Sequence, residues 1–320
     1  MVEIIFHFLK VQIIMDIKPT IEKYKTQGHL QQNKNRLNIH WDTLTICQLN
    51  CAYCYARNDY GRDWGKLASK TTIDIVLDAL ERSSLNFNLG MLGGEPTIGP
   101  HYKYILDKVS SFEKNIGIYV TTNGERDLSN DNTPKNTAFL FSYHPADCTN
   151  KDQFLSNVKF MKDNGYKCKV NVVLHPAKKY WQDIKDTIDI VLSYGVKVHP
   201  HFLYGNWDRK LYQYNKDFWD FFDFLENMEK DLKFDEDLFN DYQVYKYKLT
   251  NFKGWSCFNN NYEIDINANV VQFCKEKSDN INLLRDRDFF KNIKETKPMI
   301  CPHTECNCDG LLKQLKVRND

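Results

Sequence analysis

The sequence predicts an α/β fold in which helices connect the strands of a parallel sheet. Short apolar runs alternate with helical patterns from residue 37 to about residue 205, and six of these runs read as strands. Strands that alternate with helices form parallel sheets with right-handed crossovers, so the sheet is either doubly wound or a barrel. The chain has 320 residues, of which 42% are hydrophobic, and this suffices for an ordinary buried core.

The predicted strands are short apolar runs that end at glycine or at a polar residue. They span residues 37–46, 88–96, 115–124, 138–145, 167–175 and 197–205. Ligands of α/β folds bind at the carboxyl ends of the strands. We therefore expect the active site at the edge that carries Cys47, Gly93, Asn123, Ser142, His175 and His201.

The predicted helices are segments in which apolar residues recur three and four positions apart. Those between the strands span residues 71–84, 101–113, 151–165 and 180–195. The connection at 125–136 is polar and rich in asparagine, so we expect little helix there. After Gly205, residues 214–232 read as an aromatic-rich amphipathic helix that packs onto the sheet.

The charge and the N-terminal segment exclude several classes of partner. The net charge of +1 provides no global field that would attract nucleic acid or anionic membranes. Residues 1–14 are apolar, but the segment is too short to span a bilayer and contains Glu3 and Lys10. We expect a cytoplasmic protein that binds neither membranes nor nucleic acid.

The ten cysteines are distributed unevenly along the chain. Three lie within residues 47–54 and five within residues 257–308, and only Cys148 and Cys168 lie between the groups. Thiols stay reduced in the cytoplasm, so metal binding is favoured over a disulfide framework. The distribution indicates two metal-binding regions that are separated by a scaffold.

Cys47, Cys51 and Cys54 share one loop after the first predicted strand, in a C-x3-C-x2-C spacing. Structural zinc uses four closed ligands, usually as two paired knuckles, and no fourth cysteine follows nearby. A [4Fe-4S] cluster that is held by only three thiolates keeps one iron without a protein ligand. That iron can bind a substrate or a cofactor.

The cysteine spacing, with the aromatic Tyr53 before the last cysteine, resembles the signature of the radical SAM superfamily. The GGEP segment at 93–96 ends the second predicted strand and resembles that family's Gly-Gly-Glu motif. Gln48 stands where this branch of the family often has asparagine, a change that spares every ligand. The resemblance implies a partial (β/α)6 TIM-type barrel over residues 37–208, preceded by an N-terminal extension at 1–36.

The resemblance also implies the chemistry. The three cysteines would ligate three irons of a [4Fe-4S] cluster, and S-adenosylmethionine would chelate the fourth. One electron from the reduced cluster would cleave this cofactor to a 5'-deoxyadenosyl radical, which abstracts a hydrogen atom from the substrate. An electron donor such as flavodoxin or ferredoxin is implied as a partner.

Six residues are candidates for binding S-adenosylmethionine. Gly93 and Gly94 lack a Cβ and would let the backbone approach the cofactor closely. Glu95 would accept hydrogen bonds from the methionine ammonium, and Tyr53 offers an aromatic face near the adenine. The remaining candidates, for methionine or ribose contacts, are Asn123 and Ser142, which are otherwise ordinary polar residues at strand ends.

The second cysteine group resembles the SPASM or twitch extensions of this family. Alternating residues on both sides of the sequence NAN predict a β-hairpin from Trp255, with a cysteine at each end. The resemblance implies a helical connection at 209–254 and an auxiliary [4Fe-4S] cluster within 255–320. Four of five cysteines would hold it, and structural zinc suits the same set, in which His303 is a less favoured substitute: Cys257, Cys274, Cys301, Cys306 and Cys308.

The resemblance to SPASM and twitch proteins implies a peptide or protein substrate, modified at a side chain or an α carbon. A small molecule such as a sugar, nucleotide or amino acid is the alternative, and a non-catalytic zinc or iron-sulfur protein is the alternative of another class. Cys148, just beyond the fourth strand, would return a hydrogen atom to a substrate radical, or else is an inert loop thiol. Cys168 begins the fifth strand, where a buried structural role is expected.

Overall fold

The structure is a computed structural model, and it describes most of the chain. The described residues are 36–54, 63–203, 214–229, 251–272, 281–295, 297–302, 304 and 316–317. Four residues of the predicted second metal region lie outside them: Cys274, His303, Cys306 and Cys308. Within the described ranges, no helix is long and apolar enough to span a membrane.

A nine-stranded sheet forms the centre of the molecule, in the order β10-β9-β8-β1-β2-β3-β4-β5-β6. The strands from β1 to β6 are all parallel to their neighbours. They are β1 (Arg36–Asp42), β2 (Asn86–Leu92), β3 (Asn115–Thr122), β4 (Thr137–Tyr143), β5 (Lys167–Leu174) and β6 (Lys197–Phe202). Each overlaps one predicted run, so the predicted α/β fold with a parallel sheet is confirmed.

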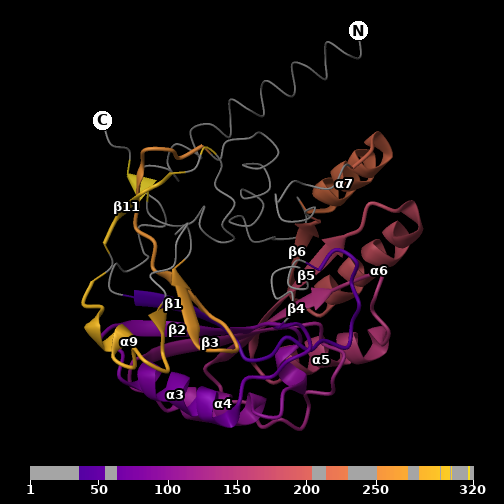
Figure 1. Cartoon of the computed structure of the whole chain (residues 1–320). Coiled ribbons are helices and arrows are strands. Elements are labelled where there is room, and N and C mark those ends of the chain that lie inside the picture. Colours follow the sequence, from indigo (N-terminus) through magenta and orange to yellow (C-terminus); the bar gives the residue numbers. More distant parts are fainter. Residues whose placement is uncertain are drawn as a thin grey trace.

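The sheet curves without closing, as Figure 1 shows. In the part of the chain that the structure describes, β6 is an edge strand that pairs with β5, and no barrel closes. A curved, open sheet of six parallel strands agrees with the expected partial TIM-type barrel.

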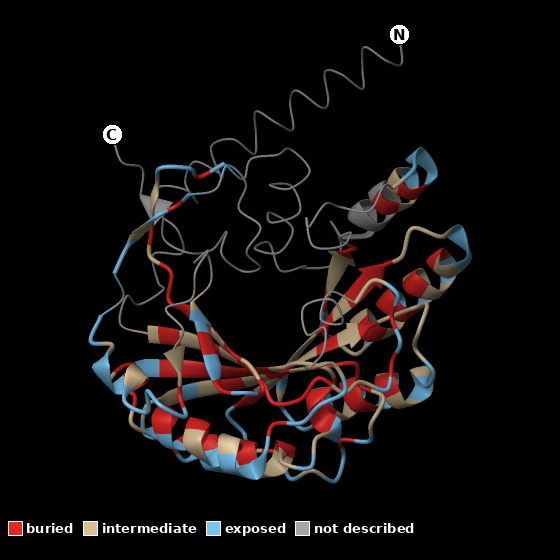
Figure 2. Ribbon diagram, viewed as in Figure 1, coloured by how far each residue is buried: buried red, intermediate tan, exposed pale blue. Residues whose placement is uncertain are grey.

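Four helices lie on the convex face of the sheet, where Figure 1 shows them as an outer layer. They are α3 (Lys70–Glu81), α4 (Tyr102–Ser110), α5 (Lys151–Asp163) and α6 (Trp181–Ser193). Their apolar sides cover the strands, and Figure 2 shows the buried layer between them. Alternate strand residues such as Phe139 and Phe141 enter this core, while Ser142 between Phe141 and Tyr143 is only half-buried.

Two short 3-10 turns and an aromatic-rich helix each come after a strand of the sheet. Two 3-10 turns, η2 (Pro96–Ile98) and η3 (Lys178–Tyr180), follow β2 and β5. Helix α7 (Lys216–Glu229) begins where the amphipathic helix was expected, and its buried Phe218 and Phe222 contact Phe202 of β6. The expectation that this helix packs onto the sheet is confirmed.

The predicted hairpin exists, but it belongs to the central sheet. Strands β8 (Asn261–Ile264) and β9 (Asn269–Gln272) are antiparallel, and β8 is parallel to β1. β10 (Ile281–Asn282) completes this edge, and α9 (Phe289–Asn292) follows.

Cys257 lies outside the hairpin, which corrects the expectation that it would form one end. It lies in β7 (Ser256–Cys257), which pairs with β11 (Met299–Ile300) and β12 (Lys316–Val317) in a separate sheet. The chain changes sheets at Asn259 and Asn260. The Asn259 side chain accepts a hydrogen bond from the Asn261 backbone, and the Asn260 side chain donates to the Arg36 carbonyl.

Candidate active site

The loop that carries the first cysteine group is held against the segment that follows β2. The backbone N–H of Gly94 donates to the Leu44 carbonyl (2.9 Å), and that of Glu95 donates to the Ile46 carbonyl (2.7 Å). A Cβ on Gly93 would overlap the Leu44 carbonyl oxygen, and a Cβ on Gly94 would overlap that of Ile46. Both positions therefore require glycine so that the two backbones can approach.

The need for glycine at this backbone contact is not evident from the sequence, which instead suggests that Gly93 and Gly94 face the cofactor. The backbone of Gly93 also has φ +112°, a conformation that side chains disfavour. Contact of either glycine with a cofactor stays a prediction.

The three cysteine side chains lie close together in this loop. The Cys54 backbone N–H donates to the Cys51 carbonyl (3.1 Å), which closes a tight turn. Cys51 is buried, and Cys47 and Cys54 are half-buried. Burial raises the pKa of the Cys47 thiol to about 11 and that of Cys51 further, and the nearby Cys54 adds to both shifts.

The donor set of this loop suits a [4Fe-4S] cluster. A cubane takes one thiolate at each of three irons, and its fourth iron then stays open to another ligand. Cys47, Cys51 and Cys54 are three thiols on one loop, and their binding of a cluster stays a prediction.

Asn123 follows β3 and directly contacts the cysteine loop. Its side-chain Nδ2 donates to the Cys47 sulfur (3.7 Å), and its Oδ1 accepts from Gln48 Nε2 (3.0 Å). The Glu125 backbone N–H donates to the same oxygen (3.1 Å). The structure thus brings this predicted residue to the first cysteine, and its contact with a cofactor stays a prediction.

Glu95 is 1% exposed, and its carboxylate joins the ends of β2 and β3. Its Oε1 accepts from the Thr97 backbone (3.1 Å), the Thr97 hydroxyl (2.6 Å) and the Thr122 hydroxyl (2.8 Å). Its Oε2 accepts from the Asn123 backbone (2.6 Å). Burial raises the pKa of this carboxyl, while these four donors oppose the shift.

The side chain of Tyr53, which belongs to the cysteine loop, contacts the histidines that follow β4 and β5. Its hydroxyl shares a hydrogen bond with His144 Nδ1 (3.1 Å), and the two rings are stacked 5.9 Å apart. His144 Nδ1 also lies 3.7 Å from the Cys51 sulfur. Burial lowers the pKa of His144 to about 4, so the ring is neutral near pH 7. His175 meets the Tyr53 ring edge to face at 6.2 Å.

His144 and Asp147 were missed in the sequence. Both follow β4, and the charge of Asp147 is the second cause, after burial, that raises the pKa of Cys51. A usable signal existed for His144, because it directly follows Tyr143, the last residue of β4.

Ser142 belongs to a polar row on one face of the sheet. It is opposite Asn171 of β5, which is in turn opposite His199 of β6. The Oδ1 of Asn171 is buried, and no described residue forms a hydrogen bond with it. His201 lies two residues beyond His199, and the two rings are 6.1 Å apart. The predicted ligand role of Ser142 stays a prediction.

Cys148 and Cys168 are both half-buried and packed against the apolar core. Burial and the neighbouring Glu125 raise the pKa of Cys148 to about 12, so this side chain is a thiol near pH 7. Its role as a hydrogen-atom donor stays a prediction. Cys168 pairs in register with Phe139 near the start of β5, where it is half-buried instead of fully buried as expected.

Two cysteines of the second group are described: Cys257 lies in β7, and Cys301 directly follows β11. Cys257 is opposite Met299 in the small sheet, and Cys301 follows two residues later. Beyond the paired strands, the Gly254 backbone N–H donates a hydrogen bond to the Cys301 carbonyl (2.9 Å). The Cys301 backbone N–H donates to the Trp255 carbonyl (2.8 Å). Both thiols are buried, Cys257 within the small sheet and Cys301 just beyond its strand β11.

Comparisons with solved structures show that this fold is shared over most of the chain. Streptococcus suis SuiB has a TM-score of 0.54 at 13% identity, over 89% of this chain and 71% of that chain. SuiB bound to the precursor peptide SuiA gives 0.53 at 15% identity, over 90% and 70%. Native anSMEcpe with bound AdoMet and the Cp18Cys peptide gives 0.57 at 12% identity, over 81% and 82%.

The comparison with protein families identifies the superfamily. No curated protein matches the chain. The family model described as "Radical SAM superfamily" matches residues 41–206, which is more than half of the chain and includes the cysteine loop, Glu95 and Asn123. The chain therefore belongs to the radical SAM superfamily, whose members are enzymes that use S-adenosylmethionine and a [4Fe-4S] cluster.

Proposed function

We propose that this enzyme abstracts a hydrogen atom from a peptide or protein substrate, at a side chain or an α carbon. The observation that carries the proposal is the loop of Cys47, Cys51 and Cys54, whose thiols lie together beside the ends of β2, β3 and β4. When bound there, a [4Fe-4S] cluster would supply the electron that cleaves S-adenosylmethionine reductively and so generates a radical for hydrogen abstraction.

The residues of this chain would hold and shield that chemistry. Cys47, Cys51 and Cys54 would bind the cluster as thiolates. Glu95 fixes the segment after β2 against the segment after β3, and Tyr53 would place an aromatic face beside the cofactor. The half-buried Cys148 is our candidate for returning a hydrogen atom to the substrate. A flavodoxin or ferredoxin would supply the electron.

Similarity of fold supports a peptide substrate. SuiB has been solved with the precursor peptide SuiA and anSMEcpe with the Cp18Cys peptide, and both share the fold of this chain. We extend the peptide substrate to this enzyme on that basis.

Cofactor cleavage tests the enzymatic part of the proposal. After anaerobic reconstitution with iron and sulfide, the wild-type protein should release 5'-deoxyadenosine from S-adenosylmethionine when dithionite is added. Cys51→Ala should abolish the release, because one iron loses its thiolate. Cys168→Ala, at the start of β5, is the matched control and should retain it. Release by Cys51→Ala at the wild-type rate would contradict the proposal.

Cofactor cleavage should also respond to the substrate. With a deuterated peptide, one deuterium should pass from the peptide to 5'-deoxyadenosine. In deuterated water, the peptide should gain one deuterium if the Cys148 thiol returns the hydrogen atom, and mass spectrometry measures both. Turnover of only small metabolites across a panel that includes short peptides would contradict the peptide assignment while leaving the cofactor chemistry intact.

A further inference from the structure

We propose that Asn123 raises the reduction potential of the cluster by donating a hydrogen bond to the Cys47 sulfur, and that Gln48 fixes the direction of this donor. The inference rests on the proposed cluster at Cys47, Cys51 and Cys54. It assigns Asn123 and Gln48 as positioning residues that act through Cys47.

The orientation of the Asn123 amide is determined by its partners. A carbonyl oxygen has two lone pairs, and Oδ1 of Asn123 accepts from two donors, Gln48 Nε2 (3.0 Å) and the Glu125 backbone (3.1 Å). In a flipped amide, Nδ2 would face both donors and Oδ1 would face the sulfur. The network therefore directs Nδ2 to the Cys47 sulfur, at 3.7 Å.

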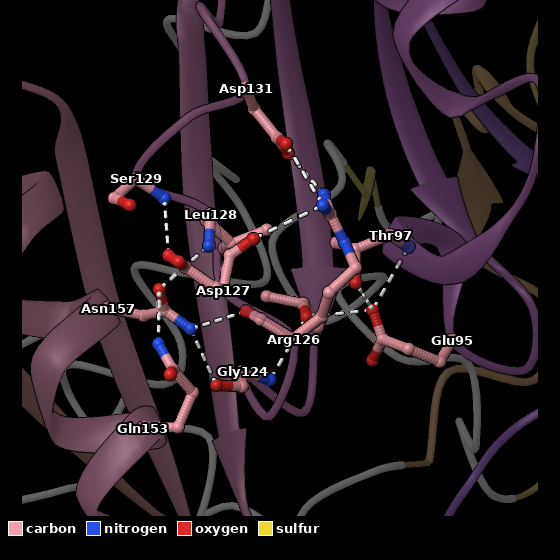
Figure 3. A network of polar contacts seen from close by, with 11 residues as sticks. Glu95, Thr97, Gly124, Arg126, Asp127, Leu128, Ser129, Asp131, Gln153 and Asn157 are labelled. Carbon is pink, nitrogen blue, oxygen red and sulfur yellow. Dashed lines mark hydrogen bonds and ion pairs between the residues drawn. The ribbon is translucent and has the colours of Figure 1, made fainter.

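The backbone of Asn123 is fixed as firmly as its side chain. Its N–H donates to the buried Glu95 carboxylate (2.6 Å). The next residue, Gly124, donates through its N–H to the Thr122 hydroxyl (3.0 Å) and accepts at its carbonyl from Asn157 of α5 (2.8 Å). Figure 3 shows Glu95 and Asn157 on opposite sides of this loop. Asn123 thus meets the cysteine loop in one geometry.

The direction of the effect follows from the charge on the sulfur. Reduction adds negative charge to the cluster and its thiolates, so an N–H donor stabilises the reduced form more than the oxidised form. A donor to Cys47 therefore raises the potential, and its removal lowers the potential. If Asn123 had only a structural role, loss of its N–H donor would not lower the reduction potential of the cluster.

The test is an anaerobic redox titration of the reconstituted protein, followed by the electron paramagnetic resonance signal of the reduced cluster. We expect Asn123→Ala to lower the ratio of reduced to oxidised cluster at a fixed potential about three- to tenfold, which corresponds to about 28 to 59 mV for one electron. Asn123→Asp should lower it further, because a carboxylate oxygen then faces the sulfur. Gln48→Met, which has similar size and no donor, should lower it less than Asn123→Ala.

Gln182→Met is the matched control for Gln48→Met. Gln182 is exposed and donates a side-chain hydrogen bond to Asp186 on α6, so its replacement should leave the potential unchanged. The inference is overturned if Asn123→Ala matches the wild type, or if Gln48→Met shifts the potential no more than Gln182→Met. Gln48 is exposed, so its variant decides the question even if Asn123→Ala fails to fold.

The outcomes separate this inference from the proposed function. If the wild-type protein forms no [4Fe-4S] signal, the proposed cluster fails and the inference fails with it. If the wild-type protein forms the cluster and cleaves S-adenosylmethionine while all four variants share its potential, only the inference fails.

Discussion

At the scale of single residues, the site depends on glycine at the place where two backbones meet. Gly94→Ala should destabilise the protein by about 3 kcal/mol or more, because the new Cβ overlaps the backbone of Ile46, which cannot move aside as a flexible side chain can. Urea denaturation followed by circular dichroism measures the loss. Iron binding at the cysteine loop should fall in the same variant.

Gly117→Ala is the control for this substitution. Gly117 lies in β3, and a Cβ there would only approach the Asn88 side chain at 3.3 Å. Its free energy of unfolding should stay within about 1 kcal/mol of the wild-type value. Equal losses in Gly94→Ala and Gly117→Ala would show that the close approach at Ile46 is not what requires glycine.

Residues could be predicted from the sequence where a short motif carries the chemistry. The three cysteines form one short motif and Glu95 belongs to another, the GGEP segment. The structure brings these two motifs together at the sheet edge. The contact of His144 with Tyr53 and Cys51 joins segments about 90 residues apart, and no local pattern encodes such a pairing. The backbone role of Gly94 likewise appears only when β1 and β2 lie side by side.

At the scale of elements, α5 anchors the loop that follows β3. The buried Asn157 accepts from the Leu128 backbone (3.0 Å) and donates to the carbonyls of Gly124 (2.8 Å) and Arg126 (2.6 Å). Asn157→Ala leaves these groups without partners and should cost about 2–4 kcal/mol of unfolding free energy. Chemical denaturation can measure the difference.

Asn136→Ala provides a comparison at an exposed position. The exposed Asn136 side chain donates a hydrogen bond to Asn115 (3.2 Å), and its loss should change the unfolding free energy by less than about 0.5 kcal/mol. A loss below 1 kcal/mol in Asn157→Ala would mean that the loop is held by its other contacts, such as the Arg126–Asp131 ion pair.

The helices and strands could be predicted from the sequence, but only part of the strand pairing could. Periodicity of 3.6 and of 2 located the helices and strands because each buries one face on a common core. The placement of β8 beside β1 could not be predicted. Alternation in the hairpin shows that Tyr262 and Ile264 need an apolar neighbour, and it does not identify which sheet edge supplies one.

At the scale of the whole molecule, the chain has two separate cysteine regions. If both hold a [4Fe-4S] cluster, the reconstituted wild-type protein should contain about eight irons and Cys257→Ser about four. Elemental analysis after gel filtration measures the iron and zinc contents. Zinc in the second region would instead give about four irons and one zinc in the wild-type protein.

Cys168→Ser serves as the control, since this residue lies within β5 of the central sheet and its replacement should not change the metal content. Eight irons in Cys257→Ser would exclude Cys257 as a ligand. Loss of all metal from the same variant would show that the two regions depend on each other for folding.

Synthesis of the chain imposes an order on the assembly of the sheet. Asn38 of β1 contacts Asn260, which is 222 positions later, so at about 5–20 residues per second the ribosome needs roughly 10 to 45 s to deliver that partner. Until then one edge of β1 has no neighbour and can recruit foreign strands. The last fifth of the chain thus covers an exposed edge of β1, the first strand of the described sheet to be synthesised, and a truncated product without this segment would be prone to aggregate.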